Sequence, residues 1–152
     1  LSDFAHRNTQ LLMRRGRYTH SSETLRNFRK LYAINSALEV DLTGQVGSEA
    51  VSGRYIGAIG GQVNFHRAGF ESAEGRAIIT LSATAGKALR PRIVSKLSGP
   101  VTTLRADADV VITEYGMAEL RGKTLVQRAE AMIAIAHPDH RAELRQAIDG
   151  LV

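Results

Sequence analysis

Two adjacent glycines, Gly60 and Gly61, interrupt a strand-like run of apolar residues over 57–65. Glycine has no Cβ atom, so it lets the backbone approach a bound group that larger residues would keep away. Two such flexible residues weaken a strand, which indicates a use for their exposed amides. The alternative interpretation is a simple turn, and it is the one we favour for most other glycines of the segment 44–86.

Carboxylates are the other group in this chain with obvious chemistry, because a glutamate can attack an acyl group and form a covalent intermediate. Glu114, at the end of a predicted strand, is the strongest candidate nucleophile in this chain. Structural hydrogen bonding is the interpretation that we favour for it. The full set of candidates is Glu39, Glu49, Glu71, Glu74 and Glu114.

Metal and phosphate motifs are weak. His137 and His140 have the spacing of two ligands on one helix face, but Pro138 between them indicates a helix start, and no third ligand lies at useful spacing. The segment 116–122 has five residues between its glycines, where a phosphate-binding loop needs four. Zero cysteines exclude disulfides and thiolate chemistry. His6 and His66 are interpreted as surface histidines.

Hydrophobic periodicity predicts an α/β fold with a single domain over 1–152. Thr124 and Gln127 have the spacing of a capping box, which begins the clearest helix. Strands are predicted at 11–17, 31–38, 51–59, 62–65, 77–81, 92–97 and 109–113. Further helices are predicted over 2–12, from Ser22 to about Arg29, and from Pro138 to a stop at Gly150.

The net charge of +5 favours an anionic partner such as nucleic acid, an anionic membrane or a phosphorylated cofactor. A solvated surface without an electrostatic role is the alternative. The 4 Tyr and 4 Phe, with no Trp, make base-stacking surfaces scarce. No apolar run approaches the roughly 20 residues that span a bilayer, and no signal peptide is evident, so we expect a cytoplasmic protein.

The first residues indicate that the chain is part of a longer enzyme. The chain begins with Leu1 rather than Met, inside a segment whose apolar residues share one helical face. A native chain would seldom start in this way without cleavage.

Several ordered sequence blocks resemble the C-terminal half of the acetyl-CoA hydrolase/4-hydroxybutyrate CoA-transferase family. The blocks are AINSALEVDLTGQV at 33–46, GGQVNF at 60–65, and strand-like runs at 77–81, 92–94 and 112–116. The resemblance implies an open, mostly parallel sheet flanked by helices. It also implies an enzyme that moves CoA between carboxylates or hydrolyses acyl-CoA, with its nucleophilic glutamate in the missing N-terminal half.

The same resemblance assigns roles to residues. It implies catalytic roles for Gly61, Gly60 and His20, with the Gly61 amide stabilising the oxyanion and His20 in a loop near the thioester. Gln62, Lys87, Arg90 and Arg92 are implied to bind the substrate, the cationic residues through CoA phosphates. The chain departs from the family pattern at Pro91, where a serine is usual.

The implied partners are acyl-CoA, small carboxylates and the N-terminal half of the same enzyme, without nucleic acid, membrane or metal. CoA is expected as a substrate rather than a permanently bound cofactor, and self-association is left open. Two other functions are left open as alternatives. One is a CoA-binding regulatory module without chemistry, and the other is a basic nucleic-acid-binding domain.

Overall fold

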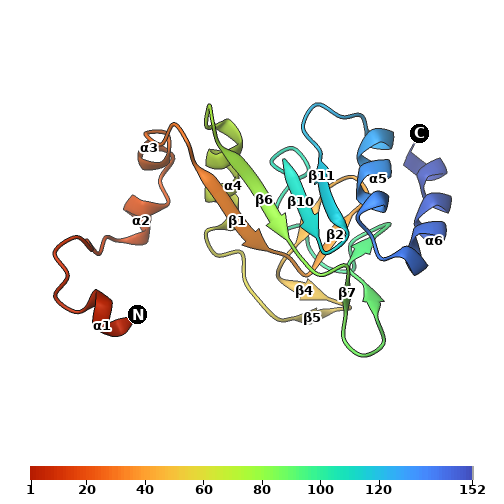
Figure 1. The fold of residues 1–152 in the computed structure, drawn as a ribbon, viewed down its shortest axis with the longest axis horizontal. Helices are drawn as coiled ribbons and strands as arrows, with labels where there is room; N and C mark the ends of the chain where they lie inside the picture. Colours follow the sequence, from red (N-terminus) through yellow and green to blue (C-terminus); the bar gives the residue numbers. More distant parts are fainter. Residues whose placement is uncertain (152) are drawn as a thin grey trace.

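The centre of the molecule is a four-stranded sheet with the order β1–β6–β10–β11 (Figure 1). Strands β1, β6 and β10 run parallel, and β11 pairs antiparallel with β10. The computed structural model describes residues 1–151 and confirms the predicted α/β fold with a mostly parallel sheet. The four strands are β1 (Tyr32–Ser36), β6 (Arg76–Thr80), β10 (Val110–Thr113) and β11 (Gly116–Glu119).

Shorter strands form a second sheet and two hairpins. The second sheet has the order β3–β2–β9, while β4 pairs with β5 and β7 pairs with β8. Their bounds are β2 (Glu39–Asp41), β3 (Val46–Gly47), β4 (Ala50–Val51), β5 (Arg54–Tyr55), β7 (Thr84–Ala85), β8 (Arg90–Pro91) and β9 (Ile93–Val94).

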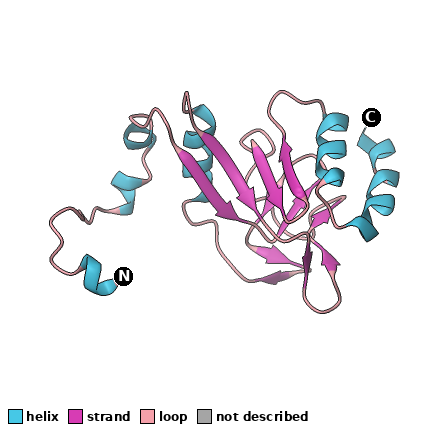
Figure 2. Ribbon diagram, viewed as in Figure 1, coloured by secondary structure: helices cyan, strands magenta, loops and turns pink. Residues whose placement is uncertain are grey.

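The helices are short, and α4 and α5 are the ones that pack against the central sheet (Figure 2). The α-helices are α1 (Ser2–Ala5), α2 (Gly16–Thr19), α3 (Ser22–Leu25), α4 (Gln62–Glu71), α5 (Leu125–Ala134) and α6 (Arg141–Gln146). Two 3-10 helices are η1 (Pro138–His140) and η2 (Ile148–Leu151).

The predicted capping box is confirmed at the start of α5. The Thr124 side chain accepts a hydrogen bond from the Gln127 amide at 3.3 Å, and the Gln127 side chain accepts one from the Thr124 amide at 3.0 Å. The last predicted helix begins at Pro138 as expected, but as a 3-10 turn followed by α6. The α-helix ends at Gln146, before the predicted stop at Gly150.

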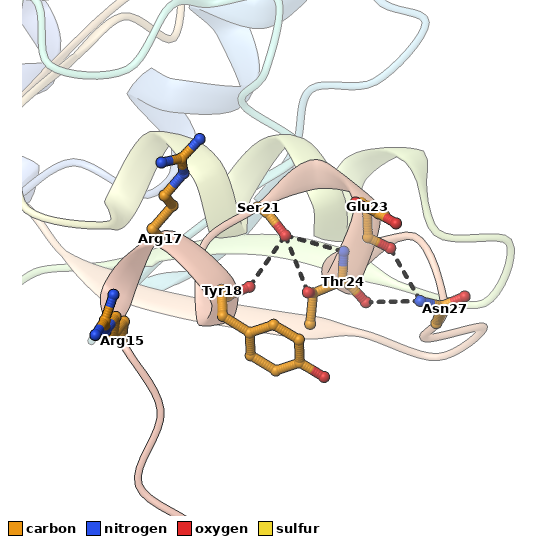
Figure 3. Close-up of a pocket in the computed structure, with 7 residues that line it drawn as sticks. All are labelled: Arg15, Arg17, Tyr18, Ser21, Glu23, Thr24 and Asn27. Atoms are coloured by element: carbon orange, nitrogen blue, oxygen red, sulfur yellow. Dashed lines mark hydrogen bonds between the residues drawn. The ribbon is translucent and has the colours of Figure 1, made fainter.

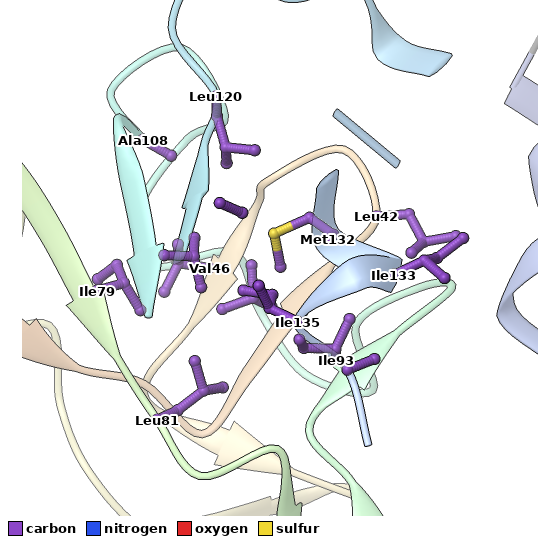
Figure 4. Close-up of a cluster of buried hydrophobic side chains, with 14 of the residues drawn as sticks. Leu42, Val46, Ile79, Leu81, Ile93, Ala108, Leu120, Met132, Ile133 and Ile135 are labelled. Carbon is purple, nitrogen blue, oxygen red and sulfur yellow. The ribbon is translucent and has the colours of Figure 1, made fainter. Parts of the chain in front are cut away.

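The hydrophobic core lies between one face of the central sheet, the three-stranded sheet and α5 (Figure 4). Ile79 of β6 and Val111 of β10 face into it from the central sheet. Val40 and Ile93 enter from the second sheet, and Met132 enters from α5. All five side chains are fully buried. The predicted strands at 31–38, 77–81 and 109–113 therefore supply the core sheet, as their apolar runs indicated.

Helix α4 covers the β1 and β6 end of the same face and runs opposite to these strands. Its C-terminal end lies beside their start, where the Ser72 hydroxyl donates to the Arg29 carbonyl at 2.6 Å and accepts from the Leu31 amide at 3.2 Å. Ten helical residues extend about 15 Å, close to the length of five strand residues. The N-terminus of α4 therefore lies level with the carboxyl ends of β1 and β6.

The predicted strand at 62–65 is wrong, because these residues form the first turn of α4. The buried positions of α4 are Gln62, His66 and Gly69, which share one helical face. Two of them are polar and one is glycine, so the apolar periodicity that identifies a helix is missing. The predicted strand at 51–59 is a hairpin of β4 and β5 followed by a loop, and the one at 92–97 shortens to β9.

The N-terminal segment extends away from the sheet (red in Figure 1), and its predicted elements are mostly wrong. The helix expected over 2–12 is limited to α1, the strand at 11–17 is a loop leading into α2, and the helix expected from Ser22 ends at Leu25. Neither α1 nor α2 has a buried residue, and Phe4 and Leu12 are exposed. Short helices are marginal without packing, which explains why the apolar stripe does not extend α1.

Candidate functional site

The N-terminus of α4 brings together two residues that the resemblance implicates, Gly61 and His20. Gly61 is the N-cap of α4, and a Cβ atom at this position would overlap the Cδ2–Nε2 edge of the His20 ring. Gly60 has φ +56°, a left-handed conformation that glycine adopts without strain. The glycine pair therefore ends a loop, starts a helix and makes room for the imidazole ring.

His20 is held over this helix end by three contacts. Its Nδ1 lies 2.9 Å from the Thr19 hydroxyl, and its ring packs edge-on against Phe65 with centroids 4.9 Å apart. The Asn64 side chain donates to the His20 carbonyl at 3.2 Å. The Thr19 hydroxyl also lies 3.4 Å from the Gly16 carbonyl, to which it can donate, so the ring tautomer decides whether Nε2, the atom on the edge nearest Gly61, is a donor or an acceptor.

The first turn of α4 can bind negative charge. An α-helix leaves its first four N–H groups without intrahelical acceptors, and the helix dipole adds partial positive charge there. Within the described part of the chain, no side chain caps these amides. Together with His20 in the tautomer that carries its proton on Nε2, this arrangement can stabilise an oxyanion or a carboxylate.

Gln62, the first residue of α4, points away from this end. Its side chain is buried and donates to the Thr103 hydroxyl at 3.1 Å. This hydrogen bond crosses 41 residues of sequence and anchors the helix to the loop after β9. The Gln62 amide group is thus engaged inside the protein, while its backbone N–H belongs to the uncapped first turn.

His66, one turn further along α4, is fully buried, which contradicts its interpretation as a surface histidine; His6 is exposed as expected. Neither ring nitrogen of His66 has a hydrogen-bond partner among the described residues. Burial lowers the pKa of His66 to about 4, and the nearby Asp107 carboxylate opposes this shift. Its ring is therefore neutral at physiological pH. No apolar periodicity around this position indicated its burial.

Arg92 lies at the carboxyl edge of the central sheet, and its guanidinium is engaged by backbone. It donates to the Leu38 carbonyl at 2.8 Å and to the Ala37 carbonyl. Burial lowers the pKa of Arg92, and the carboxylates of Glu114 and Glu39 oppose the shift. Arg92 thereby fastens the chain after β1 to β9.

An open cavity of about 420 Å³ lies at this carboxyl edge, where open α/β sheets bind their ligands. Glu114, the candidate nucleophile of this chain, accepts a hydrogen bond from the Ala83 amide at 2.8 Å. That bond fits the structural role favoured from the sequence. The cavity is lined by Ser36, Thr80, Leu81, Ser82, Arg92, Ile112 and Glu114.

Lys87 and Arg90 lie on the hairpin of β7 and β8, where both are exposed. Within the described residues, no hydrogen bond or ion pair joins this hairpin to His20 or Gly61. Figure 1 draws the hairpin at the lower right and α2 at the far left. The structure therefore groups His20, Gly60 and Gly61, and it leaves Lys87 and Arg90 as a separate cationic element.

A further cavity, of about 500 Å³, lies beside α2 and α3 and was not predicted (Figure 3). Ser21 shapes its wall, because its hydroxyl donates to the Tyr18 carbonyl at 3.0 Å and accepts from the Thr24 amide at 3.2 Å. Arg15 and Arg17 line it and form no ion pair among the described residues. The arginine run at 14–17 was the signal in the sequence.

The residues that the structure describes contain neither a grouped metal site nor a membrane-spanning helix. Among them, no three His, Cys, Asp or Glu side chains are grouped to hold a metal ion. The rings of His137 and His140 lie near the start of α6 with centroids 5.8 Å apart and planes tilted by 56°. None of the helices over residues 1–151 is both long and apolar enough to cross a bilayer.

Sequence comparison confirms the resemblance seen in the sequence blocks. The family model of the acetyl-CoA hydrolase/transferase C-terminal domain matches residues 1–148. The 4-hydroxybutyrate coenzyme A transferase of Clostridium kluyveri is 42% identical over 146 residues, covering 95% of this chain and 34% of that enzyme. The acetyl-CoA hydrolase of Candida albicans is 32% identical over 145 residues, covering 92% of this chain and 26% of that protein.

Solved structures show the same fold. The crystal structure of 4-hydroxybutyrate CoA-transferase from Porphyromonas gingivalis superposes with a TM-score of 0.81 at 37% identity, covering 99% of this chain and 34% of the other. RipA from Yersinia pestis superposes with a TM-score of 0.82 at 38% identity, covering 89% and 31%. This chain spans between a quarter and about a third of the length of these relatives. It belongs to the acetyl-CoA hydrolase/transferase C-terminal domain family.

Proposed function

We propose that this chain is the CoA-binding C-terminal part of an enzyme that transfers CoA between carboxylates or hydrolyses acyl-CoA. Its substrates are an acyl-CoA and a small carboxylate, and CoA is a substrate rather than a resident cofactor. The nucleophilic carboxylate comes from the N-terminal part of the enzyme, so the 152-residue chain alone is inactive. Family membership and the uncapped N-terminus of α4 beside His20 support this proposal.

The first turn of α4 stabilises charge on the thioester oxygen. When a carboxylate oxygen attacks the thioester carbon, the carbonyl π electrons move to the oxygen, which becomes an alkoxide. Donors about 3 Å from that oxygen lower the barrier because they favour the transition state over the substrate. The N–H of Gly61 is the proposed donor, and Gly60 allows the close approach of the backbone. Collapse of the intermediate then expels the CoA thiolate.

His20 supplies a second polar contact to the same oxygen through Nε2. Thr19 and Phe65 fix the orientation of the ring, so its donor is in place before the substrate binds. This preorganisation is the feature that makes such a hydrogen bond effective in catalysis. His20 thus acts as a stabilising donor and not as a general base in this proposal.

Lys87 and Arg90 hold phosphates of CoA, and Arg92 supports the fold. The hairpin cations are exposed and free to reach a ligand, as binding of a mobile polyanion requires. Arg92 contributes to the site only indirectly, because its guanidinium N–H groups already donate to the Leu38 and Ala37 carbonyls.

The test uses a joined enzyme, in which this chain replaces the matching third of the Clostridium kluyveri transferase. CoA transfer from acetyl-CoA to 4-hydroxybutyrate is measured on folded protein. Gly61→Ala should lower kcat by about 10²–10³ with little change in KM, because its Cβ collides with His20 and displaces the amide donors. In a His20→Gly background the methyl group has room, so the same change should cost far less.

Two outcomes would contradict the proposal, one for the enzyme activity and one for the role of Gly61. A joined enzyme that folds but transfers no CoA contradicts the proposed function. A Gly61→Ala variant with unchanged kcat shows that the glycine pair is only a turn. If Gly61→Ala lowers the unfolding temperature without lowering kcat in the surviving folded fraction, the contact with His20 is structural.

A further inference from the structure

One face of the central sheet carries apolar side chains that no described part of the chain covers. Tyr32 and Ile34 of β1 are 50% and 62% exposed, and Met117 of β11 is 59% exposed. Their sequence neighbours Ala33 and Ala118 are buried, because adjacent residues of a strand point to opposite faces. In Figure 1, α4 passes behind β1 and β6, and no helix is drawn in front of these two strands.

The strand register makes these residues one continuous surface. Ile34 lies opposite Ile78, Ile78 lies opposite the buried Val110 of the strand that carries Ile112, and Ile112 lies opposite Met117. Ile78 and Ile112 are half-buried by their own neighbours and occupy the strands between the two edges. We name this surface the open sheet face, and it consists of Tyr32, Ile34, Ile78, Ile112 and Met117.

The open sheet face is unusual for this type of fold. Parallel sheets occur almost only with both faces covered, because their strands are joined by helices that pack above and below. Here the opposite face is covered by α4, α5 and the three-stranded sheet. A contiguous apolar patch of this kind generally marks an interaction site.

We propose that the open sheet face binds an amphipathic helical segment from the N-terminal part of the enzyme, an inference that rests on the proposed function. About two thirds of each relative's polypeptide lies outside the part that this chain matches, which is ample for such a layer. The occupant is a helix because helices are the elements that cover parallel sheets.

The rim of the surface adds a charge preference. Arg76 pairs in register with Tyr32, and its side chain is 43% exposed while its guanidinium lies 3.6 Å from the buried Asp109 carboxylate. Lys30 places its ammonium 5.9 Å from the Tyr32 ring centroid. The bound helix should therefore carry carboxylates on the flank that meets this end of the sheet.

Cysteine labelling tests the proposal directly, because the chain contains no cysteine of its own. Ile34→Cys and Met117→Cys report on the open sheet face, and Glu130→Cys on the exposed side of α5 is the matched control. Rates of maleimide modification are measured at each peptide by mass spectrometry, in the 152-residue chain and in the joined enzyme. We expect both face positions to react at least about tenfold more slowly in the joined enzyme, with the control unchanged.

Equal rates at position 34 or 117 in the two proteins would overturn the proposal. Slow labelling in the isolated chain that recovers on dilution would assign the surface to a second copy instead, which also overturns it. Ile34→Glu and Met117→Glu provide an independent measurement. They should leave the urea midpoint of the isolated chain unchanged and lower that of the joined enzyme.

CoA transfer measured on the same joined enzyme keeps the two proposals separable. Protection of Ile34→Cys and Met117→Cys without transfer activity supports the surface and contradicts the proposed function. Transfer activity without protection contradicts the surface and leaves the proposed function standing.

Discussion

Lowering the pH from 7.5 to 5 should destabilise this chain through the buried ring of His66. The pKa of this ring is lowered to about 4 by burial, whereas an exposed histidine in the unfolded chain has a pKa of about 6.5. Between these values the unfolded state binds more protons than the folded state, so stability falls as the pH falls. The stability is fully present above about pH 6.5 and is lost progressively toward pH 4. For this interval, linkage gives a loss of about 2 kcal/mol.

Urea unfolding followed by circular dichroism at the two pH values measures this loss. Other groups also titrate over the interval, so His66→Leu provides the reference. The wild-type chain should lose about 2 kcal/mol more than the variant on acidification. At pH 7.5 the leucine should be neutral or stabilising, because both ring nitrogens of His66 lack partners among the described residues.

The same measurement can refute the reasoning. An equal loss in the wild-type chain and in His66→Leu would mean that the ring can be protonated without leaving the folded state. His6→Gln is the matched control, because His6 is exposed in α1's C-cap position. This change should leave the difference in stability between the two pH values as it is in the wild type.

Two further predictions concern the cations near the proposed CoA site. Arg92→Ala should lower the free energy of unfolding in urea by about 1.5–3 kcal/mol, since it removes charged hydrogen bonds to two carbonyls. In the joined enzyme the same change should alter kcat/KM equally for acyl-CoA and acyl-pantetheine. A loss of kcat/KM for acyl-CoA alone would contradict the structural role. Lys87→Ala combined with Arg90→Ala should raise KM for acyl-CoA about tenfold and spare acyl-pantetheine. The increase in KM for acyl-CoA should become smaller as the salt concentration rises. An equal increase in KM for both substrates would contradict phosphate binding.

The central sheet was predictable because its strands are short runs of β-branched apolar residues. Ile78 and Ile79 in β6, and Val110 to Ile112 in β10, read as strands without further information. The capping box of α5 was equally predictable, since it depends on two residues three positions apart. In each of these cases the signal is local and the tertiary structure agrees with it.

Helix α4 could not be predicted in this way, because its buried face carries an amide, an imidazole and a glycine. Gln62 is buried through a hydrogen bond to Thr103, a residue distant in sequence. Gly69 is required because a larger residue would meet the Arg76 carbonyl and the Ala33 side chain. These reasons lie in partners that the chain brings together only after folding, so no periodicity of the helix itself reveals them.

Arg92 shows the same limit at the candidate site. Its sequence position, two residues after Arg90 on a basic stretch, is consistent with a phosphate contact. The structure instead places its guanidinium against the Leu38 and Ala37 carbonyls, across more than 50 residues of sequence. Arg90 is exposed, whereas Arg92 is partly buried. The burial of Arg92 depends on the pairing of β2 with β9, which no local sequence pattern encodes.

The contact between His20 and Gly61 combines a local sequence signal, the glycine pair, with a tertiary contact that only the folded chain makes. The glycine pair was visible in the sequence as an unusual feature, but its meaning was assigned to a strand that does not exist. In the structure the absence of a Cβ atom at Gly61 has a definite steric cause, which is the ring of His20. A glycine required by packing and a glycine required by catalysis predict the same residue at position 61. Both requirements act through His20, because alanine keeps its backbone N–H and disturbs the donors at the start of α4 only by colliding with that ring. Kinetics separates them, since a catalytic requirement lowers kcat whereas a packing requirement lowers only the unfolding temperature.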